Sequence, residues 1–275
     1  MAEHHSVGPA ETGRAAPSGD HAGHRAGVLH DPADQVTMIT YGPGDPVPAG
    51  PMADWLEFVG DPRPRLLFAT TDAEARSDSV AALQRDVPGV SVLEIEQRGR
   101  APIEIEAEAL VAAARRATTR WLLFFKLDTL PFRIGRDRWL AEVLAQIEAA
   151  GCSGFAGSAR WPDLTPAGDG WAKTQRFSLN FGLIERERFL RIVERESAQA
   201  LEKVRVGGVR SAERFFVEAA IERDQRDAGR WNLFLPETPE FSVFHVNVWG
   251  EKLERVRERY RRRIGIGPFL NTAKP

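Results

Sequence analysis

The sequence predicts an α/β fold, in which helices flank a mainly parallel central sheet within a single large domain. Three observations lead to this prediction. From residue 36 onwards, short apolar runs alternate with longer segments whose apolar residues recur at helical spacing, which is typical of strands joined by crossover helices. Residues 121–125 are continuously apolar, as expected for a strand that is covered on both faces. The segment just before them, 104–118, has the strongest helical composition in the chain.

The composition is that of a soluble globular protein. Of the 275 residues, 43% are hydrophobic and 28% are charged, which is enough to build a full core. The net charge of −2 argues against general nucleic-acid binding. The single cysteine, Cys152, excludes an intrachain disulfide and suits a reducing compartment. Because no stretch approaches the roughly 20 apolar residues of a membrane span, and no signal-peptide core is evident, we expect a cytoplasmic protein.

Residues 1–34 are expected to form a disordered tail. Glycine, proline, alanine and histidine predominate there, and large apolar residues are nearly absent, so little burial can offset the entropy of ordering the chain. The histidines of this tail are irregularly spaced, which favours adventitious over specific metal binding.

Residues 35–249 are expected to form the folded domain, and residues 250–275 a basic helix and tail. Glycine, proline, threonine and aspartate separate the apolar segments of the domain. The expected strands cover residues 36–41, 66–69, 90–95, 121–125, 152–158, 177–184 and 241–249. The expected helices cover residues 52–59, 73–85, 104–118, 137–150 and 185–203, and one more begins at Ser211.

Asp128 is the first candidate site residue. It follows the apolar run 121–125 within Lys-Leu-Asp-Thr, and ligands of open α/β sheets bind at the carboxyl ends of the strands. An aspartate followed by Thr-Leu-Pro is also ordinary turn chemistry. Position alone therefore leaves a ligand site and a structural turn both open.

The order of these elements, with Thr-Thr-Asp at 70–72 and Lys-Leu-Asp-Thr at 126–129, resembles the nucleotide-binding half of GT-A glycosyltransferases, especially those of family 2. The resemblance covers roughly residues 35–249. It implies transfer of a sugar from a nucleotide-diphosphate sugar to a small-molecule or glycan acceptor, more often with inversion. It also implies that Thr70, Thr71 and Asp72 face the nucleoside, and that residues 177–184 lie beneath the donor sugar, where Asn180 and Gly182 permit close approach.

The same resemblance implies that Asp128 belongs to an Asp-x-Asp motif that binds Mg²⁺ or Mn²⁺ at the diphosphate. Leu130 stands where the second aspartate is expected, and the loss of one carboxylate lowers the charge and the affinity of such a site. Either Asp128 binds the cation with another ligand, or basic groups neutralise the phosphates directly.

His245 is the candidate for the additional metal ligand, because some GT-A enzymes use a late histidine in this way. It lies within an apolar strand segment, where a polar group needs a partner, and a core histidine bonded to a backbone carbonyl would give the same pattern. Lys126 and Arg133, with Arg136 and Arg138 nearby, are candidates for pairing with the phosphates. A solvated basic loop is the alternative interpretation.

Glu213 is the candidate general base. In inverting family members an acidic residue, often within Glu-Asp, begins a helix of this kind and deprotonates the acceptor, and Glu213 matches only the first position of that pair. The helix dipole also favours a glutamate there. Asp163 and Asp169 are substitutes, on a loop whose two tryptophans predict either acceptor binding or core packing.

Two other classes of function stay open. The incomplete Asp-x-Asp also fits a non-catalytic GT-A-like protein that binds nucleotide or glycan, or acts as a scaffold. A nucleotidyltransferase would need a glycine-rich, lysine-containing phosphate loop near the first strand, and Gly-Pro-Gly at 42–44 is a poor match. The basic amphipathic helix Glu251–Arg263 predicts contact with anionic lipid, contact with an acidic partner, or packing on the domain.

Overall fold

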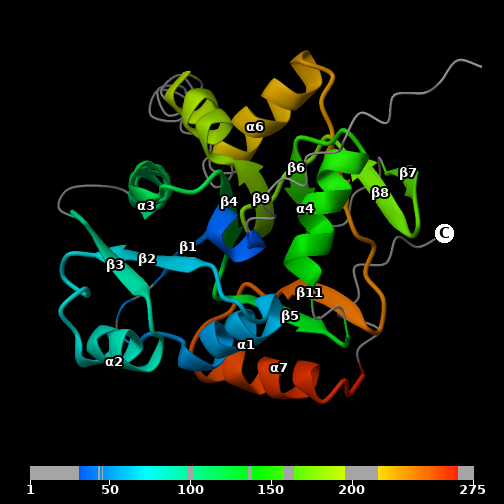
Figure 1. The fold of residues 1–275 in the computed structure, drawn as a ribbon. Coiled ribbons are helices and arrows are strands. Elements are labelled where there is room, and N and C mark those ends of the chain that lie inside the picture. The colour runs from blue at the N-terminus through cyan, green and yellow to red at the C-terminus, as the bar shows by residue number, and fades with distance from the viewer. Residues whose placement is uncertain are drawn as a thin grey trace, which may run out of the picture.

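The computed structural model describes residues 31–42, 44, 46–97, 102–135, 138–157, 164–195 and 216–265. The expected tail therefore lies almost wholly outside the described residues. After the short 3-10 helix η1 (Pro32–Gln35), the described chain folds around one large sheet (Figure 1). None of its described helices is long and apolar enough to cross a bilayer.

The large sheet has nine strands, and the four strands at one end of it are parallel to one another. In spatial order the strands are β3 (Val90–Ile95), β2 (Arg65–Thr71), β1 (Val36–Tyr41), β4 (Trp121–Phe125), β9 (Phe181–Glu185), β6 (Gly154–Ala156), β10 (Asn232–Phe234), β8 (Trp171–Thr174) and β7 (Thr165–Gly168). Strands β3, β2, β1 and β4 are parallel, and β9 lies antiparallel between β4 and β6. This sheet confirms the α/β fold class that the sequence predicts.

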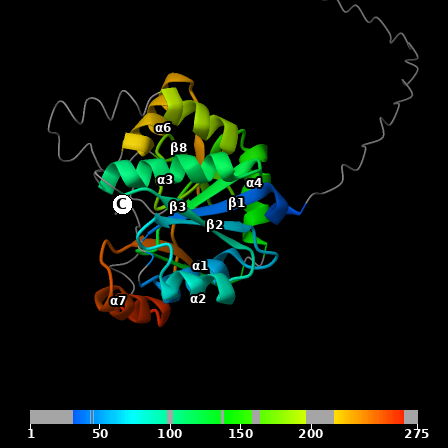
Figure 2. The same ribbon diagram turned by 90° about the vertical axis from the view of Figure 1, so that its left-hand side faces the viewer.

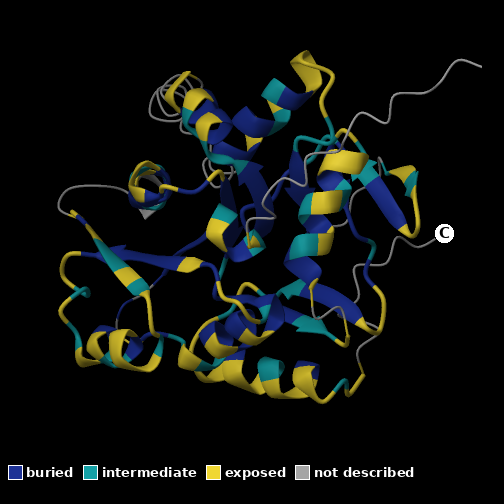
Figure 3. Ribbon diagram, viewed as in Figure 1, coloured by how far each residue is buried: buried dark blue, intermediate teal, exposed yellow. Residues whose placement is uncertain are grey.

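Helices cover both faces of the sheet. Helices α1 (Ala49–Val59), α2 (Asp78–Asp86) and α4 (Trp139–Ala149) share one core, and α3 (Pro102–Arg116), residues 186–195 and α6 (Phe216–Asp227) share the other. Figure 2 shows α3 and α6 on the opposite side of the sheet from α1 and α2. Every side chain of β4 is buried, as expected for a strand covered on both faces (Figure 3).

Among the element boundaries that differ from the prediction, two differ for local reasons. Helix α2 begins at Asp78, not near residue 73, because the Ser77 hydroxyl caps it by accepting a hydrogen bond from Val80 N at 3.2 Å. The last expected strand, 241–249, ends at His245, where a left-handed Asn247 (φ 53°) and Gly250 (φ 62°) turn the chain.

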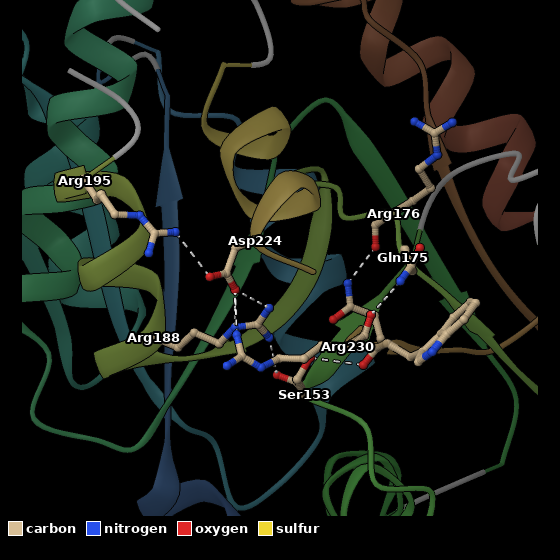
Figure 4. Close-up of polar contacts among 9 residues, drawn as sticks. Ser153, Gln175, Arg176, Arg188, Arg195, Asp224 and Arg230 are labelled. Atoms are coloured by element: carbon tan, nitrogen blue, oxygen red, sulfur yellow. Dashed lines mark hydrogen bonds and ion pairs between the residues drawn. The ribbon is translucent and has the colours of Figure 1, made fainter. Parts of the chain in front are cut away.

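Helix α6 is fixed to the helical residues 186–195 by an ion-pair cluster (Figure 4). Asp224 of α6 accepts hydrogen bonds from Arg188 at 2.9 and 3.1 Å and from Arg230 at 2.9 Å. Burial lowers the pKa of Arg188, and the contact with Asp224 opposes that shift. The cluster sets the position of α6 relative to the sheet.

The basic helix α7 (Glu251–Arg261) packs on the domain. Its side chains Leu253 and Tyr260 are buried against Leu130, and its Arg257 donates to the buried Asp54 of α1 at 2.8 Å. Two residues of the apolar stripe, Leu253 and Tyr260, are therefore covered by protein, whereas Ile264 is exposed. This arrangement gives no support to the predicted membrane contact.

Candidate functional site

A cavity of about 380 Å³ opens at the carboxyl ends of β1, β2 and β4. Ligands of open α/β sheets bind at this edge. The residues that line the cavity are Tyr41, Gly42, Thr71, Glu74, Gln97, Glu106, Lys126, Asp128 and Trp249.

Asp128 lies on a turn that is hydrogen-bonded to α1. Thr129 N donates to Lys126 O at 3.1 Å and closes the turn that follows β4. The fully buried Trp55 donates its indole N–H to Lys126 O at 3.1 Å and to Thr129 O at 3.0 Å. With its backbone fixed in this way, the Asp128 carboxylate has little freedom to leave the cavity wall.

A two-stranded sheet brings His245 to Asp128. Strand β5 (Thr129–Arg133) pairs antiparallel with β11 (Phe241–His245), and this register places His245 opposite Thr129. Val246 N donates to Asp128 O at 3.0 Å, and His245 Nε2 lies 3.1 Å from Asp128 Oδ2. The structure thus brings together the two predicted metal ligands, which are 117 residues apart in the sequence.

Asn180 completes this polar chain. Its side-chain Nδ2 lies 3.2 Å from His245 Nδ1, and its backbone oxygen accepts from Lys126 N at 3.2 Å. Because an amide NH₂ can only donate, Nδ1 of His245 accepts and the ring proton lies on Nε2, where it is donated to Asp128 Oδ2. The other carboxylate oxygen, Asp128 Oδ1, is buried and has no hydrogen-bond partner among the described residues.

The Asp128–His245 pair fits two positions in the coordination shell of a divalent cation, whose other positions would be filled by substrate phosphates and water. Two atoms that coordinate Mg²⁺ at neighbouring corners of an octahedron lie about 3 Å apart, and the observed Nε2–Oδ2 separation is 3.1 Å. The described ranges contain no cluster of three or more His, Cys, Asp or Glu that could hold a metal ion. Mg²⁺ is often bound by only one or two protein groups together with substrate phosphates and water.

Leu130 explains why a second aspartate is missing from this turn. Its side chain is 1% exposed and packs with Leu253 and Tyr260 of α7. A carboxylate at this position would be buried among apolar side chains, which is costly without a partner. The packing of α7 therefore requires an apolar residue at position 130, where the second carboxylate would otherwise stand.

Lys126 supplies positive charge to the same cavity. Its Nζ lies 2.9 Å from Glu106 Oε1, and both side chains are about one quarter exposed. Burial opposes the charge on Lys126, but Glu106, Glu218 and Asp128 outweigh it and raise the pKa of the ammonium. The lysine therefore remains charged beside Asp128.

The Thr-Thr-Asp segment lies at the end of β2, and its three side chains differ in their access to the cavity. The hydroxyls of Thr70 and Thr71 both donate to Glu74 Oε2, at 3.2 and 3.0 Å. Thr71 lines the cavity, whereas Thr70 is fully buried. Asp72 is exposed and accepts from Gln97 N at 3.2 Å. The structure thus brings Thr71 to the cavity and leaves Asp72 beside Gln97 on its rim.

The other predicted residues lie elsewhere. Arg133 is at the far end of β5, where its side chain donates to Gly135 O at 2.7 Å and lines a separate hollow with Asp54 and Phe58. Asp169 lies on the turn between β7 and β8, and Trp171 is buried in the core. The predicted base Glu213 and its substitute Asp163 lie outside the described residues, as do Arg136 and Trp161.

Sequence reasoning missed two residues near the site. Trp249 is 45% exposed and lines the cavity, although the sequence placed it within a strand. Gly250, which directly precedes the predicted basic helix Glu251–Arg263, is the sequence signal that the strand has already ended. Glu218 of α6 is 9% exposed and contacts a loop 39 residues away in the sequence, and nothing local predicts that contact.

The comparisons with known proteins concern the fold. No protein-family model and no curated protein matches the chain. Solved structures that match include the mannosyltransferase PcManGT from Pyrobaculum calidifontis in complex with GDP-Man and Mn²⁺, with 16% identity, a TM-score of 0.46, and 87% of this chain and 65% of that chain covered. TarS residues 1–349 from S. aureus match with 9% identity, a TM-score of 0.47, and coverages of 76% and 60%.

A UDP-glucose pyrophosphorylase complexed with UDP-glucose also matches, with 9% identity, a TM-score of 0.49, and 83% of this chain and 99% of that chain covered. This chain spans less than two thirds of the mannosyltransferase and TarS chains. With TM-scores below 0.5 and identities of 16% or less, these matches add no argument to the fold that the strand order shows.

Proposed function

We propose that this protein is a glycosyltransferase that moves a sugar from a nucleotide-diphosphate sugar to an acceptor hydroxyl. One observation carries the proposal. Asp128 and the charged Lys126 line a cavity at the carboxyl edge of the parallel strands, and His245 is paired with Asp128 there. A carboxylate, an imidazole and an ammonium at one point are suited to a diphosphate and its cation.

Asp128 and His245 would hold Mg²⁺ or Mn²⁺. When bound, the cation would stabilise the negative charge of the leaving diphosphate. His245 can present Nε2 to it only after the ring proton moves to Nδ1. The side-chain amide of Asn180 can turn over so that its oxygen accepts a hydrogen bond from Nδ1–H, and this residue therefore serves either tautomer of His245.

Lys126 would bind the phosphate oxygens, and Glu106 holds its ammonium in place. Thr71 and Asp72 would face the nucleoside, with Gln97 beside them. Trp249 would cover the bound donor at the mouth of the cavity, because its exposed indole offers an apolar face for a ring. Arg133 remains a predicted phosphate ligand whose position does not support that role.

Glu213 would act as the general base of an inverting transfer. It precedes the described start of α6 by three residues, and α6 packs against the loop that carries Asn180. A carboxylate that is ionised at working pH can accept the proton of the acceptor hydroxyl.

The test is release of nucleoside diphosphate from a panel of nucleotide sugars, after thermal shift selects those that stabilise the protein. Wild type should hydrolyse or transfer from at least one donor, and His245→Gln should lose that activity while it remains folded. Asp86→Asn, a change on an exposed residue of α2 remote from the cavity, is the control. A protein that binds nucleotide diphosphates and turns over no donor would instead fit the non-catalytic alternative.

A further inference from the structure

A buried carboxylate lies on the first turn of α6, next to the cavity. Glu218 is 9% exposed and its Oε1 accepts a hydrogen bond from Leu179 N at 2.6 Å. The Ser178 hydroxyl donates a second hydrogen bond to the same carboxylate. A carboxylate buried in this way is costly unless such donors satisfy it.

Glu218 acts on the loop between β8 and β9, not on the cavity wall directly. Its neighbour one turn along α6, Glu222, accepts from Phe177 N at 3.3 Å and from Arg176 at 3.1 Å. The two glutamates therefore hold successive parts of one loop, and Glu218 holds the part closest to β9.

The loop transmits this contact to the site within two residues. The Ser178 hydroxyl also accepts from Asn180 N at 3.2 Å. The Asn180 side chain bonds to His245 Nδ1, and His245 Nε2 bonds to Asp128. The backbone N–H of Asn180 is held by the Ser178 hydroxyl, which Glu218 orients. The position of the Asn180 side-chain amide therefore depends on Glu218.

We propose that Glu218 is a positioning residue, whose buried carboxylate orients Ser178 and Leu179 so that the Asn180 amide stays in hydrogen-bonding contact with His245. The inference rests on the proposed function of the Asp128–His245 pair. Glu218 lies on a different element from Asp128 and His245. Its partners are a backbone N–H and a hydroxyl, and it does not contact either predicted metal ligand.

The ionised form of Glu218 is the one that fits this role. An ionised carboxylate accepts from both Leu179 N–H and the Ser178 hydroxyl, and a protonated one competes with Ser178 as a donor. Burial raises the pKa of Glu218 to about 7, while the Leu179 hydrogen bond and the Lys126 charge oppose the shift and Glu106 adds to it. Near neutral pH both forms of Glu218 are therefore populated, and the ionised form is the one that holds the loop.

The experiment compares Glu218→Gln with its matched control, Glu222→Gln, in the full chain. The affinity for UDP and GDP in the presence of Mn²⁺ is measured between pH 6 and 8. At pH 8 Glu218→Gln should bind about tenfold more weakly than wild type, as for other partners that orient a metal ligand. At pH 6 the two should converge, because wild-type Glu218 is then protonated, and Glu222→Gln should follow wild type throughout.

A ratio of affinities that is the same at pH 6 and pH 8, or an equal effect of Glu222→Gln, would overturn the proposal. A second readout does not need a nucleotide. His245 is the one histidine outside residues 1–30, so its ring resonances are assigned by their loss in His245→Gln. At pH 8 they should shift in Glu218→Gln and in Ser178→Ala, and stay in place in Glu222→Gln.

These two readouts separate the proposals. If wild type binds no nucleoside diphosphate while the His245 resonances respond to Glu218, the proposed function fails and the positioning role stands. If the nucleotide binds and the His245 resonances are the same in wild type, Glu218→Gln and Ser178→Ala, the positioning role fails alone.

Discussion

At the scale of single residues, the two oxygens of Asp128 lie in different environments. Oδ2 accepts from His245, and Oδ1 is buried without a hydrogen-bond partner among the described residues. Asn has the same shape, but it removes the negative charge that the proposed cation site would need and that faces Lys126. Asp128→Asn should therefore affect the reaction while leaving the stability of the fold nearly unchanged.

We predict that Asp128→Asn lowers kcat/KM for the donor at least about 100-fold. The midpoint of thermal unfolding should change little, since the backbone of the turn is held by Trp55. Asp86→Asn is the control for a generic loss of charge. Turnover equal to wild type in Asp128→Asn would reject the assignment of this carboxylate.

Glu218 should make folding stability depend on pH. Its pKa is raised from 4.5 to about 7, so between these values the folded state binds a proton that the unfolded state has released. The contribution is therefore fully present below about pH 4.5 and is lost as pH rises through about 7, by up to roughly 3 kcal/mol.

Urea unfolding from pH 4.5 to 8 measures this effect. The difference in unfolding free energy between wild type and Glu218→Gln should fall across that range, whereas the difference between wild type and Glu222→Gln should stay nearly constant. Equal profiles for wild type and Glu218→Gln would contradict a raised pKa at this residue.

The sequence predicts Asp128 and His245 as partners at one site, and the structure places them in contact. A carboxylate after an apolar strand and a lone histidine in an apolar segment are both visible without coordinates. Glu218 was not visible in this way, because its partners are a backbone N–H and a hydroxyl on a remote loop. Trp249 was missed because its exposure depends on where β11 ends.

At the scale of elements, α1 holds the turn that carries Asp128. The indole N–H of Trp55 bonds to two carbonyls of that turn. Trp139 of α4 is equally buried in the same core, and its indole N–H has no hydrogen-bond partner among the described residues. Trp55 and Trp139 therefore allow a comparison between a buried tryptophan whose indole N–H is hydrogen-bonded and one whose indole N–H is not.

We predict that Trp55→Phe costs about 2 kcal/mol more unfolding free energy than Trp139→Phe, because the first removes a hydrogen-bonded indole N–H and the second removes a buried N–H that has no partner among the described residues. Trp55→Phe should also weaken nucleotide binding, since the turn loses its support. Chemical denaturation and calorimetry on both variants measure the two effects. Equal losses in both would show that the indole hydrogen bonds do not hold the turn.

Helix α7 depends on Asp54, which is 6% exposed and accepts from Arg257 and Arg261. Asp54→Asn leaves two guanidinium groups without their carboxylate. We expect a loss of about 2 kcal/mol, below the usual cost of breaking a buried pair because Arg261 is partly solvated. Glu57→Gln, which affects only an exposed contact of Arg261, should change the unfolding free energy by less than about 0.5 kcal/mol.

The helices and parallel strands were predictable from the sequence, since apolar periodicity is a local signal. The pairing of β5 with β11 was not predictable, because it joins segments more than 100 residues apart through backbone hydrogen bonds. The expected strand 177–184 begins only at Phe181, because Glu222 and Glu218 bind the preceding residues as a loop.

At the scale of the whole molecule, the sheet edge gathers residues from distant parts of the chain. β2 contributes Thr71, β4 leads into Lys126 and Asp128, and β11 ends at His245. Helix α7 supports the underside of β5, and α6 supports the loop that carries Asn180. The site is therefore a property of the complete fold, and the resemblance of short motifs identified only part of it.

The central claim is that Asp128 and His245 form one site for a nucleoside diphosphate and its cation. Isothermal titration calorimetry with UDP and with GDP, each with Mn²⁺ and with a chelator, tests it most directly on wild type and His245→Gln. We predict that wild type binds at least one of these nucleotides, about tenfold or more weakly when the metal is chelated, and that His245→Gln loses the metal dependence. Binding that is indifferent to both metal and His245, or no binding at all, would contradict the claim.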